Sequence, residues 1–145
     1  MDSIRFILSN GHVYDTSNQS HYQRFIEMDS ALSEGIRQCK LEIESSQNMV
    51  NKIRDKYRIK NTLGYSLNSF LDYEHPLDIF AHLLVGAEGT LAFISQVTLN
   101  TIPDPPYKTT GLILFESVEK AIQALPIFIN EGADAVELLD DASLR

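Results

Sequence analysis

Two glycines and a glutamate separate an apolar segment from a long alternating one in LLVGAEGTLAFISQVTLNTI, residues 83–102. Gly86 and Gly89, which flank Glu88, can adopt positive φ and let another backbone or a flat ligand approach closely. The same pair is also typical of a tight turn from a helix to a strand. The spacing therefore predicts either a turn that faces a ligand or a purely structural turn.

The residues after this turn alternate as expected for a half-buried β-strand. One predicted face carries Leu91, Phe93, Val97 and Leu99. The other carries Ala92, Ile94, Gln96, Thr98 and Asn100. The glycine turn would then stand directly before a strand, where main-chain groups are available for binding.

A second short segment, KNTLGY at residues 60–65, combines residue types that suit a turn. Asn61 and Gly64 tolerate left-handed backbone. Tyr65 offers a flat apolar ring, whose hydroxyl must find a partner if it is buried. By itself this segment predicts only a turn.

Together the two segments resemble one enzyme family. Residues 86–94, GAEGTLAFI, are similar to the G-[SA]-E-G-T-L-G-x-[IV] segment of FAD-linked oxidases and dehydrogenases of the vanillyl-alcohol-oxidase superfamily. Residues 60–65 resemble the K-N-x-x-G-Y element of its D-lactate, glycolate and D-2-hydroxyglutarate dehydrogenase branch. The spacing between the two segments is similar to that of long members that carry an iron–sulfur domain.

The resemblance implies an α+β fold in which FAD lies between two subdomains. Residues 1–103 would form the second subdomain of a PCMH-type FAD-binding domain, with a mainly antiparallel sheet and flanking helices. Residues 104–145 would begin the substrate-binding cap with a partial β-α-β unit. The first subdomain, which holds the glycine-rich pyrophosphate loop, would lie outside this chain.

The resemblance also assigns cofactor-binding residues, which would approach FAD largely through main-chain groups. They are Asn61, Gly64, Tyr65, Gly86, Glu88, Gly89, Thr90, Leu91, Ala92, Phe93 and Ile94. Backbone N–H and C=O groups can pair with a nucleotide edge whatever the side chain is. Ala92 departs from the usual glycine of the family, and its methyl group should fit if φ is negative there.

The reaction that the resemblance implies is oxidation of a D-2-hydroxy acid, of the D-lactate, glycolate or D-2-hydroxyglutarate type, with hydride transfer to flavin N5. The family's catalytic and metal-binding residues come from cap sequence beyond this chain, so we assign none here. The partners would be the missing first subdomain and the rest of the cap. If the parent is like the long members of the family, an iron–sulfur domain or subunit would accept the electrons.

The isolated chain is expected to be inactive and to bind FAD weakly or not at all. About half of the cofactor contacts would be missing. Association costs about 4–15 kcal/mol of lost freedom before any contact helps. FAD would therefore be a cofactor of the complete protein rather than of this segment.

Two other classes of function stay open. The first is a non-catalytic interaction module of α+β fold, because an incomplete β-α-β unit leaves a sheet edge that favours self-association. The second, a different nucleotide-binding enzyme, is disfavoured. The sequence has neither a G-x-G-x-x-G that opens a helix nor a G-K-[ST] phosphate loop.

Composition narrows the class of protein further. Of the 145 residues, 43% are hydrophobic, as in an ordinary globular domain. A formal net charge of -8 opposes binding to nucleic acid. There is no long apolar run or secretory leader, and the single cysteine, Cys39, excludes an intramolecular disulfide. We therefore expect a cytoplasmic protein.

The elements that would position the two motif segments begin with a hairpin. Asn-Gly at residues 10–11 predicts a two-residue type I′ turn, which places Leu8 opposite Val13 on a core face. His12 would lie beside the turn in solvent. Residues 16–23 are polar and predict a loop.

Helices are predicted between this hairpin and the alternating strand. Apolar residues at helical spacing predict one helix from residue 30 to a break at residues 45–48, and a second up to residue 57. A third would start at Pro76 and be closed by Gly86. Cys39 falls on the apolar face of the first helix, where we expect a small buried hydrophobe.

A boundary is predicted at the proline-rich residues 103–106, because proline cannot continue a sheet ladder. Beyond it, the apolar runs at residues 111–115 and 135–139 predict two parallel strands. They would be joined by a helix that is capped by Ser117 and is kinked or shortened at Pro126.

Overall fold

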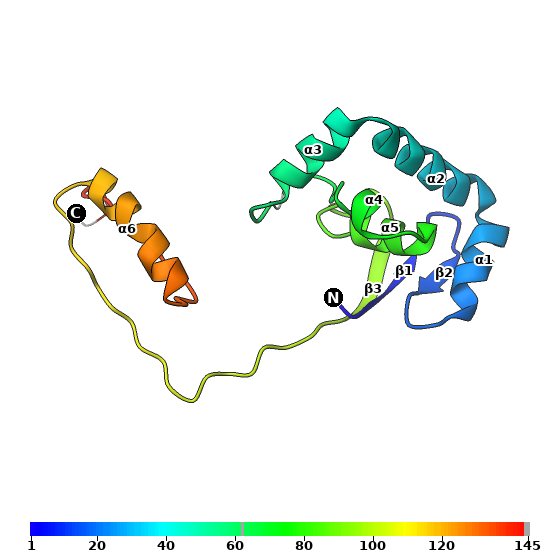
Figure 1. Cartoon of the computed structure of the whole chain (residues 1–145). Helices are drawn as coiled ribbons and strands as arrows, with labels where there is room; N and C mark the ends of the chain where they lie inside the picture. Colours follow the sequence, from blue (N-terminus) through cyan, green and yellow to red (C-terminus); the bar gives the residue numbers. More distant parts are fainter. Residues whose placement is uncertain (62, 144–145) are drawn as a thin grey trace. The chain divides into compact units, whose positions relative to one another are not determined.

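The computed structural model describes residues 1–61 and 63–143, which form two compact units (Figure 1). The first unit is Met1–Ile102, and the second starts at Pro103. The first contains a small sheet and five of the helices that the structure describes, and the second contains a single described helix. Both motif segments belong to the first unit.

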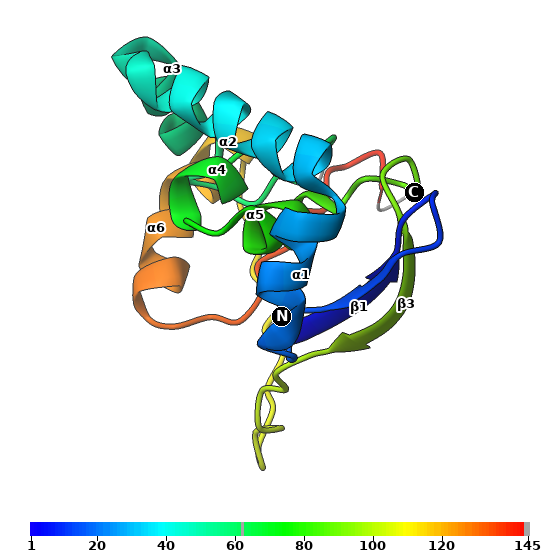
Figure 2. The ribbon, with the colours of Figure 1, turned by 90° about the vertical axis from the view of Figure 1, so that its right-hand side faces the viewer.

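A three-stranded antiparallel sheet in the order β2-β1-β3 forms one layer of the first unit. The central strand β1 (Ser3–Ile7) pairs with β2 (Val13–Asp15) on one side and with β3 (Phe93–Thr98) on the other. Figure 2 shows β1 and β3 running side by side although they are far apart in the sequence. This pairing brings the start of β3 next to the β1–β2 hairpin.

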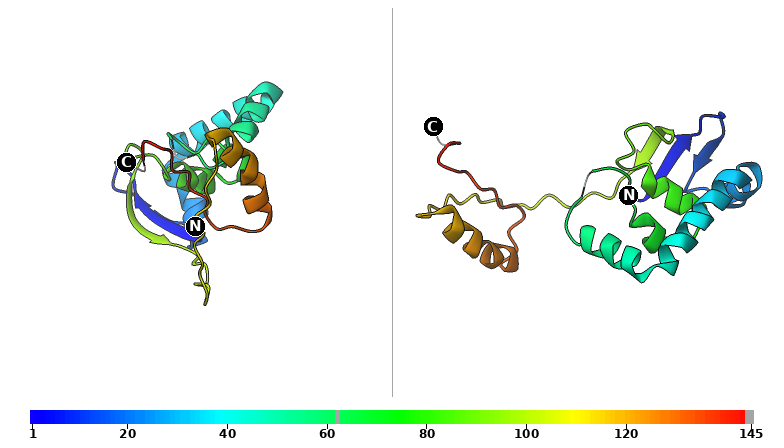
Figure 3. Two further views of the ribbon diagram at one scale, coloured as in Figure 1. Left: turned by 90° about the vertical axis from the view of Figure 1, so that its left-hand side faces the viewer. Right: turned by 90° about the horizontal axis from the view of Figure 1, so that it is seen from above.

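The helices gather on one side of this sheet (Figure 3). The longest of them, α2, contacts each of the other four. They are α1 (Ser20–Met28), α2 (Ser30–Ser45), α3 (Gln47–Lys56), α4 (Ser69–Asp72) and α5 (Pro76–Leu83). The predicted helix after residue 30, the one that follows it and the one that starts at Pro76 are confirmed.

The core lies between the sheet and the helices, and aromatic rings fill its centre. Phe6 of β1 packs on Phe80 of α5 with ring centroids 5.4 Å apart. Tyr14 of β2 meets the ring of Phe25 edge-on at 5.0 Å. These rings anchor α1 and α5 to the sheet, because each buries a large apolar area.

The hairpin has a different register from the predicted one. Val13 lies opposite Ile7 and not opposite Leu8. The N–H of Gly11 donates to the carbonyl of Leu8 at 2.9 Å, and Gly11 alone in this loop has positive φ, at 86°. A type I′ turn needs two such residues, so a three-residue loop ending in a left-handed glycine forms instead.

Strand β3 is not the half-buried alternating strand that the pattern predicts. All six of its residues are exposed, with Phe93 at 69%. Its register with β1 shifts part-way along, so Ile94 lies opposite Phe6 and Val97 lies opposite Ile4. Cross-strand partners share a face, so the bulge puts Ile94 and Val97 on one side and breaks the predicted grouping of Phe93 with Val97.

Two local predictions upstream are also wrong. Helix α1 takes up part of the predicted polar loop at residues 16–23, because it can bury Phe25 against the sheet. Cys39 is exposed rather than buried. Helix α2 turns Ile36 and Ile43 inward instead, which leaves the cysteine at the margin of its buried face.

The second unit contains α6 (Val118–Asn130), whose cap Ser117 accepts a main-chain N–H at 3.3 Å as predicted. Residues 111–115 and 135–139 are not strands, so the predicted partial β-α-β unit is wrong. A strand needs a neighbour for its N–H and C=O groups, and the described part of this unit supplies none. The helix continues through Pro126 to its end, so this proline does not shorten it.

None of the helices in the described part of the chain combines the length and the hydropathy that a membrane span requires.

Candidate cofactor site

The two motif segments at residues 60–65 and 86–94 lie against each other in the first unit. The hydroxyl oxygens of Tyr65 and Thr90 are 2.9 Å apart and share a hydrogen bond. Thr62, which belongs to the first motif, lies outside the described residues. The structure therefore joins two segments that the sequence connects only through their resemblance to one family.

The main chains of the two segments approach most closely at Gly64 and Gly86. A Cβ on Gly86 would stand 2.9 Å from the carbonyl oxygen of Gly64, closer than real Cβ atoms come to another atom. Gly86 also has φ of 86° and Gly64 has φ of 71°. The glycine at position 86 is thus required by the partner segment itself, and α5 leads directly into this contact.

The turn between α5 and β3 carries two further left-handed residues, Glu88 with φ of 51° and Gly89 with φ of 75°. Thr90 closes the turn, because both its N–H and its hydroxyl donate to the carbonyl of Ala87, at 3.0 and 2.6 Å. The N–H groups of Glu88, Gly89 and Leu91 donate to no other described residue. The turn thus holds three main-chain donors that no described residue accepts.

A groove of about 400 Å³ runs along this stretch, and we call it the hairpin groove. One wall is the end of β1 with the following loop, and the other is the turn with the start of β3. Its lining residues are Ile7, Leu8, Ser9, Gly89, Thr90, Leu91, Ala92 and Phe93. Five of the predicted cofactor residues therefore line one groove.

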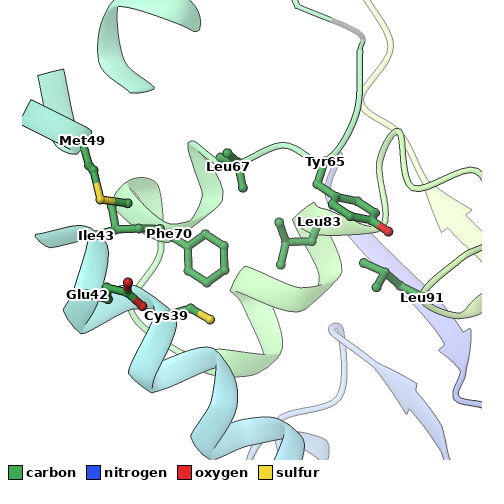
Figure 4. A pocket seen from close by; sticks show the side chains of 9 residues that line it. All are labelled: Cys39, Glu42, Ile43, Met49, Tyr65, Leu67, Phe70, Leu83 and Leu91. Atoms are coloured by element: carbon green, nitrogen blue, oxygen red, sulfur yellow. The ribbon is translucent and has the colours of Figure 1, made fainter. Parts of the chain in front are cut away.

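A second groove, of about 360 Å³, meets the hairpin groove at Leu91 (Figure 4). This apolar groove is lined by Cys39, Glu42, Ile43, Met49, Tyr65, Leu67, Phe70, Leu83 and Leu91. In Figure 4 the ring of Tyr65 stands beside Leu91 at one end, and Met49 lies at the other. Its largely hydrocarbon lining suits a flat apolar ring, as in most small-molecule sites.

The other predicted residues do not line these two grooves. The side chain of Asn61 accepts the N–H of Leu63 at 3.1 Å and so forms a local turn. Ile94 lies within β3, and Gly64 supports Gly86 from behind. Glu88 is exposed at the tip of the turn.

Ala92 does not have positive φ, so the condition for accommodating its methyl group is met.

The lining of both grooves carries little charge. Glu42 in the apolar groove is the one ionised residue type among the lining residues, and no lysine or arginine is among them. Within residues 1–61 and 63–143, no group of three or more His, Cys, Asp or Glu side chains is arranged to hold a metal ion. A largely apolar lining without lysine or arginine fits an uncharged ring system better than a diphosphate.

Sequence reasoning missed the wall formed by Ile7, Leu8 and Ser9. These residues reach the site because β1 pairs with β3, which begins more than 80 residues later. The signal that could have found them is the pairing of two apolar strands. Which strands pair cannot be read from either segment alone.

Comparison with known proteins finds relatives that are named as dehydrogenases or oxidases of 2-hydroxy acids. The chain is 29% identical to a D-2-hydroxyglutarate dehydrogenase of Haemophilus influenzae over 149 residues, which cover 99% of this chain and 14% of that relative. It is 35% identical to the D-2-hydroxyglutarate dehydrogenase of Pantoea ananatis over 57% of this chain and 8% of the relative. It is 37% identical to the glycolate oxidase subunit GlcD of Escherichia coli K12 over 43% of this chain and 13% of the relative.

The chain thus spans only a small part of the length of these curated relatives. No family model and no solved structure matches it. The relatives nevertheless bear the substrate names that the two motif segments predict, and the structure joins those segments in one site. The names of these relatives support the resemblance of the two motif segments to FAD-linked D-2-hydroxyacid dehydrogenases.

Proposed function

We propose that this chain is part of an FAD-dependent oxidoreductase that oxidises a D-2-hydroxy acid, and that its two grooves receive part of the flavin. The observation that carries the proposal is the junction of the motif segments, where Tyr65 bonds Thr90 and Gly64 abuts Gly86. The names of the relatives support the substrate class. D-2-hydroxyglutarate is the first substrate to test, because the relative that aligns with 99% of the chain is a D-2-hydroxyglutarate dehydrogenase.

In this proposal the chain contributes binding and orientation. The N–H groups of Gly89 and Leu91, two residues that line the hairpin groove, would donate to acceptor atoms at the edge of the flavin, while the ring of Tyr65 would pack beside it. When bound, FAD supplies the acceptor for the hydride of the hydroxy acid. Because no lysine or arginine lines either groove, the diphosphate would be held by the first subdomain in the longer protein.

The experiment is a comparison of the longer parent protein with the 145-residue chain. We expect the purified parent to be yellow and to bleach on addition of D-2-hydroxyglutarate, D-lactate or glycolate, and the isolated chain to stay colourless when titrated with FAD. A folded parent that neither retains nor takes up flavin would overturn the assignment. Micromolar affinity of the isolated chain for FAD would overturn the division of the site between two subdomains.

A matched pair of variants locates the flavin on this chain. Ser9 lines the hairpin groove from the loop and belongs to neither motif segment. We expect Ser9→Trp to fill the groove and weaken flavin binding by the parent at least tenfold. Lys52→Trp, at an exposed position on α3 outside both grooves, should leave flavin binding unchanged. Equal affinity in the two variants would place the flavin elsewhere.

A non-catalytic interaction module is the second candidate function, and one observation favours it. No described residue of the second unit is buried, and α6 exposes Ile122, Ile127 and Ile129 at 58–62%. An exposed apolar surface of this kind is typical of a site that binds another protein surface. If the parent carries no flavin while the 145-residue chain dimerises by light scattering, this module becomes the better assignment.

A further inference from the structure

Asp29 joins two helices but does not cap the helix that it precedes. Asp29 is the C-cap residue of α1 and the N-cap residue of α2. An aspartate at a helix N-cap ordinarily accepts N–H groups from the first turn of its own helix. The carboxylate of Asp29 makes no such bond, although its side chain is only 7% exposed.

The carboxylate is held by the β1–β2 hairpin instead. The side-chain amide of Asn10 donates to Oδ1 at 2.7 Å. Nδ1 of His12 lies 2.9 Å from Oδ2, and the hydroxyl of Tyr14 donates to the same oxygen. Contrary to prediction, His12 is therefore not a free solvent residue beside the turn. Hydrogen bonds to an ionised carboxylate are stronger than neutral ones, so Asp29 with these three donors forms a clasp, which we call the Asp29 clasp.

The Asp29 clasp is itself built into the core. The ring of Tyr14 is fully buried and packs edge-on against Phe25 of α1 at 5.0 Å. The guanidinium of Arg24 lies over the same ring, 5.6 Å from its centre. The Asp29 clasp therefore ties the hairpin to the junction of α1 and α2, not to a mobile surface side chain.

The residues in the Asp29 clasp are bonded directly to one wall of the hairpin groove. The N–H of Leu8 donates to the carbonyl of His12 at 2.9 Å. The side-chain oxygen of Asn10 accepts the N–H of His12 at 3.0 Å, which closes the loop on itself. Leu8 and Ser9 form the wall that faces Gly89. Fixing Asn10 and His12 therefore fixes the position of this wall.

We propose that Asp29 is a positioning residue for the cofactor site, because it holds in place the loop at residues 9–11, which adjoins Leu8 and contributes Ser9 to one wall of the hairpin groove. The proposal rests on the proposed function for what occupies the groove, but the Asp29 clasp can be tested without any ligand. Asp29 bonds the hairpin and makes no capping bond to α2. A residue whose role is confined to α2 would instead accept N–H groups from the first turn of that helix.

The first test is hydrogen exchange on the 145-residue chain. Asp29→Ser keeps a good N-cap for α2 but is too short to reach the three donors. We expect the amides of Leu8 and Gly11 to exchange at least tenfold faster, while the amide of Ile79 in α5 changes less than twofold. Asp55→Ser, at an exposed aspartate on α3, is the matched control and should change none of them.

A gentler variant covers the case in which Asp29→Ser fails to fold. His12→Phe removes one donor at a partly exposed position and keeps an aromatic ring. It should speed exchange at the same two hairpin amides, Leu8 and Gly11, by about threefold. Unchanged exchange in the folded variants would overturn the Asp29 clasp, whatever the groove binds.

The second test is flavin affinity of the parent, measured where all variants are folded. Asp29→Ser should weaken FAD binding at least tenfold. Asp29→Asn keeps an acceptor oxygen for the hairpin and should restore affinity to within threefold of the wild type. Unchanged affinity in Asp29→Ser would overturn the positioning role. A parent without flavin would overturn the proposed function. The hydrogen-exchange experiment would then still test whether the Asp29 clasp holds the hairpin.

Discussion

The carbonyl oxygen of Gly64 occupies space that any side chain on Gly86 would need, 2.9 Å from the ideal Cβ position. This contact joins the two motif segments through their main chains. The hydrogen bond between Tyr65 and Thr90 joins them again through side chains. The candidate site is therefore one connected junction rather than two separate loops, and the following predictions test it.

Gly86→Ala should destabilise the first unit strongly. Left-handed φ costs a non-glycine residue about 1–2 kcal/mol, and the clash with a main-chain oxygen adds about 1–3 kcal/mol. Gly89→Ala is the matched control, because Gly89 also has positive φ but has no atom within 4 Å of its Cβ position. It should lose only the conformational part, on the order of 1 kcal/mol. Urea unfolding measures both, and equal losses would refute the close contact.

Glu88→Gly should stabilise the chain by up to about 1 kcal/mol, because Glu88 has φ of 51° and glycine adopts this backbone without steric cost. Glu42→Gly, within α2, should have the opposite sign and cost up to about 1 kcal/mol. Thermal unfolding of the two variants gives the comparison. A destabilised Glu88→Gly would mean that the glutamate side chain makes a stabilising contact at the turn.

The hydrogen bond between Tyr65 and Thr90 should show as coupling in a double-mutant cycle. Tyr65→Phe is expected to cost about 0.5–1.5 kcal/mol in free energy of unfolding. Thr90→Val should cost more, because the Thr90 hydroxyl also donates to the carbonyl of Ala87. The coupling energy should be about 0.5–1 kcal/mol. A coupling near zero would mean that the two hydroxyls bond water instead.

Asp29 should make stability depend on pH in the acid range. Burial alone would raise the pKa of this carboxyl, but hydrogen bonds from its three hairpin donors hold the pKa below its ordinary value. A carboxyl with a lowered pKa in the folded state contributes stability above its unfolded pKa of about 3.9 and loses it as pH falls through the folded value. The difference in free energy of unfolding between wild type and Asp29→Asn should therefore be largest above pH 5 and shrink toward pH 2. A difference that is constant with pH would contradict the lowered pKa.

Limited digestion with trypsin should separate the two units. Residues 103–116 are exposed throughout, and Lys108 is the basic residue in the first half of this stretch. We expect early cleavage after Lys108 and a stable product that ends there, detected by mass spectrometry. The product should unfold cooperatively, with the same midpoint as the first unit of the whole chain. Earlier cleavage within α2 or α3 would show that the first unit does not hold together by itself.

Local signals in the sequence predicted much of the first unit. Pro76 at the start of α5 and Gly86 after α5 each act within a few residues, and each is found as expected in the structure. The residue types of the two motif segments likewise predicted the kind of relatives that the comparison found. Several of the predictions that failed concerned contacts with distant segments. The hairpin register, the faces of β3 and the strands at residues 111–115 and 135–139 depend on what lies beside them.

The sequence by itself determined helices α2, α3 and α5 and the two segments whose residue types resemble a cofactor site. Only the tertiary structure decided that Gly64 lies against Gly86 and that Ile7 and Leu8 face Gly89 across a groove. It also decided that Asp29 bonds a hairpin in preference to its own helix. Caps and turns are each worth about 1 kcal/mol, so burial of a shared core outweighs them wherever the two conflict.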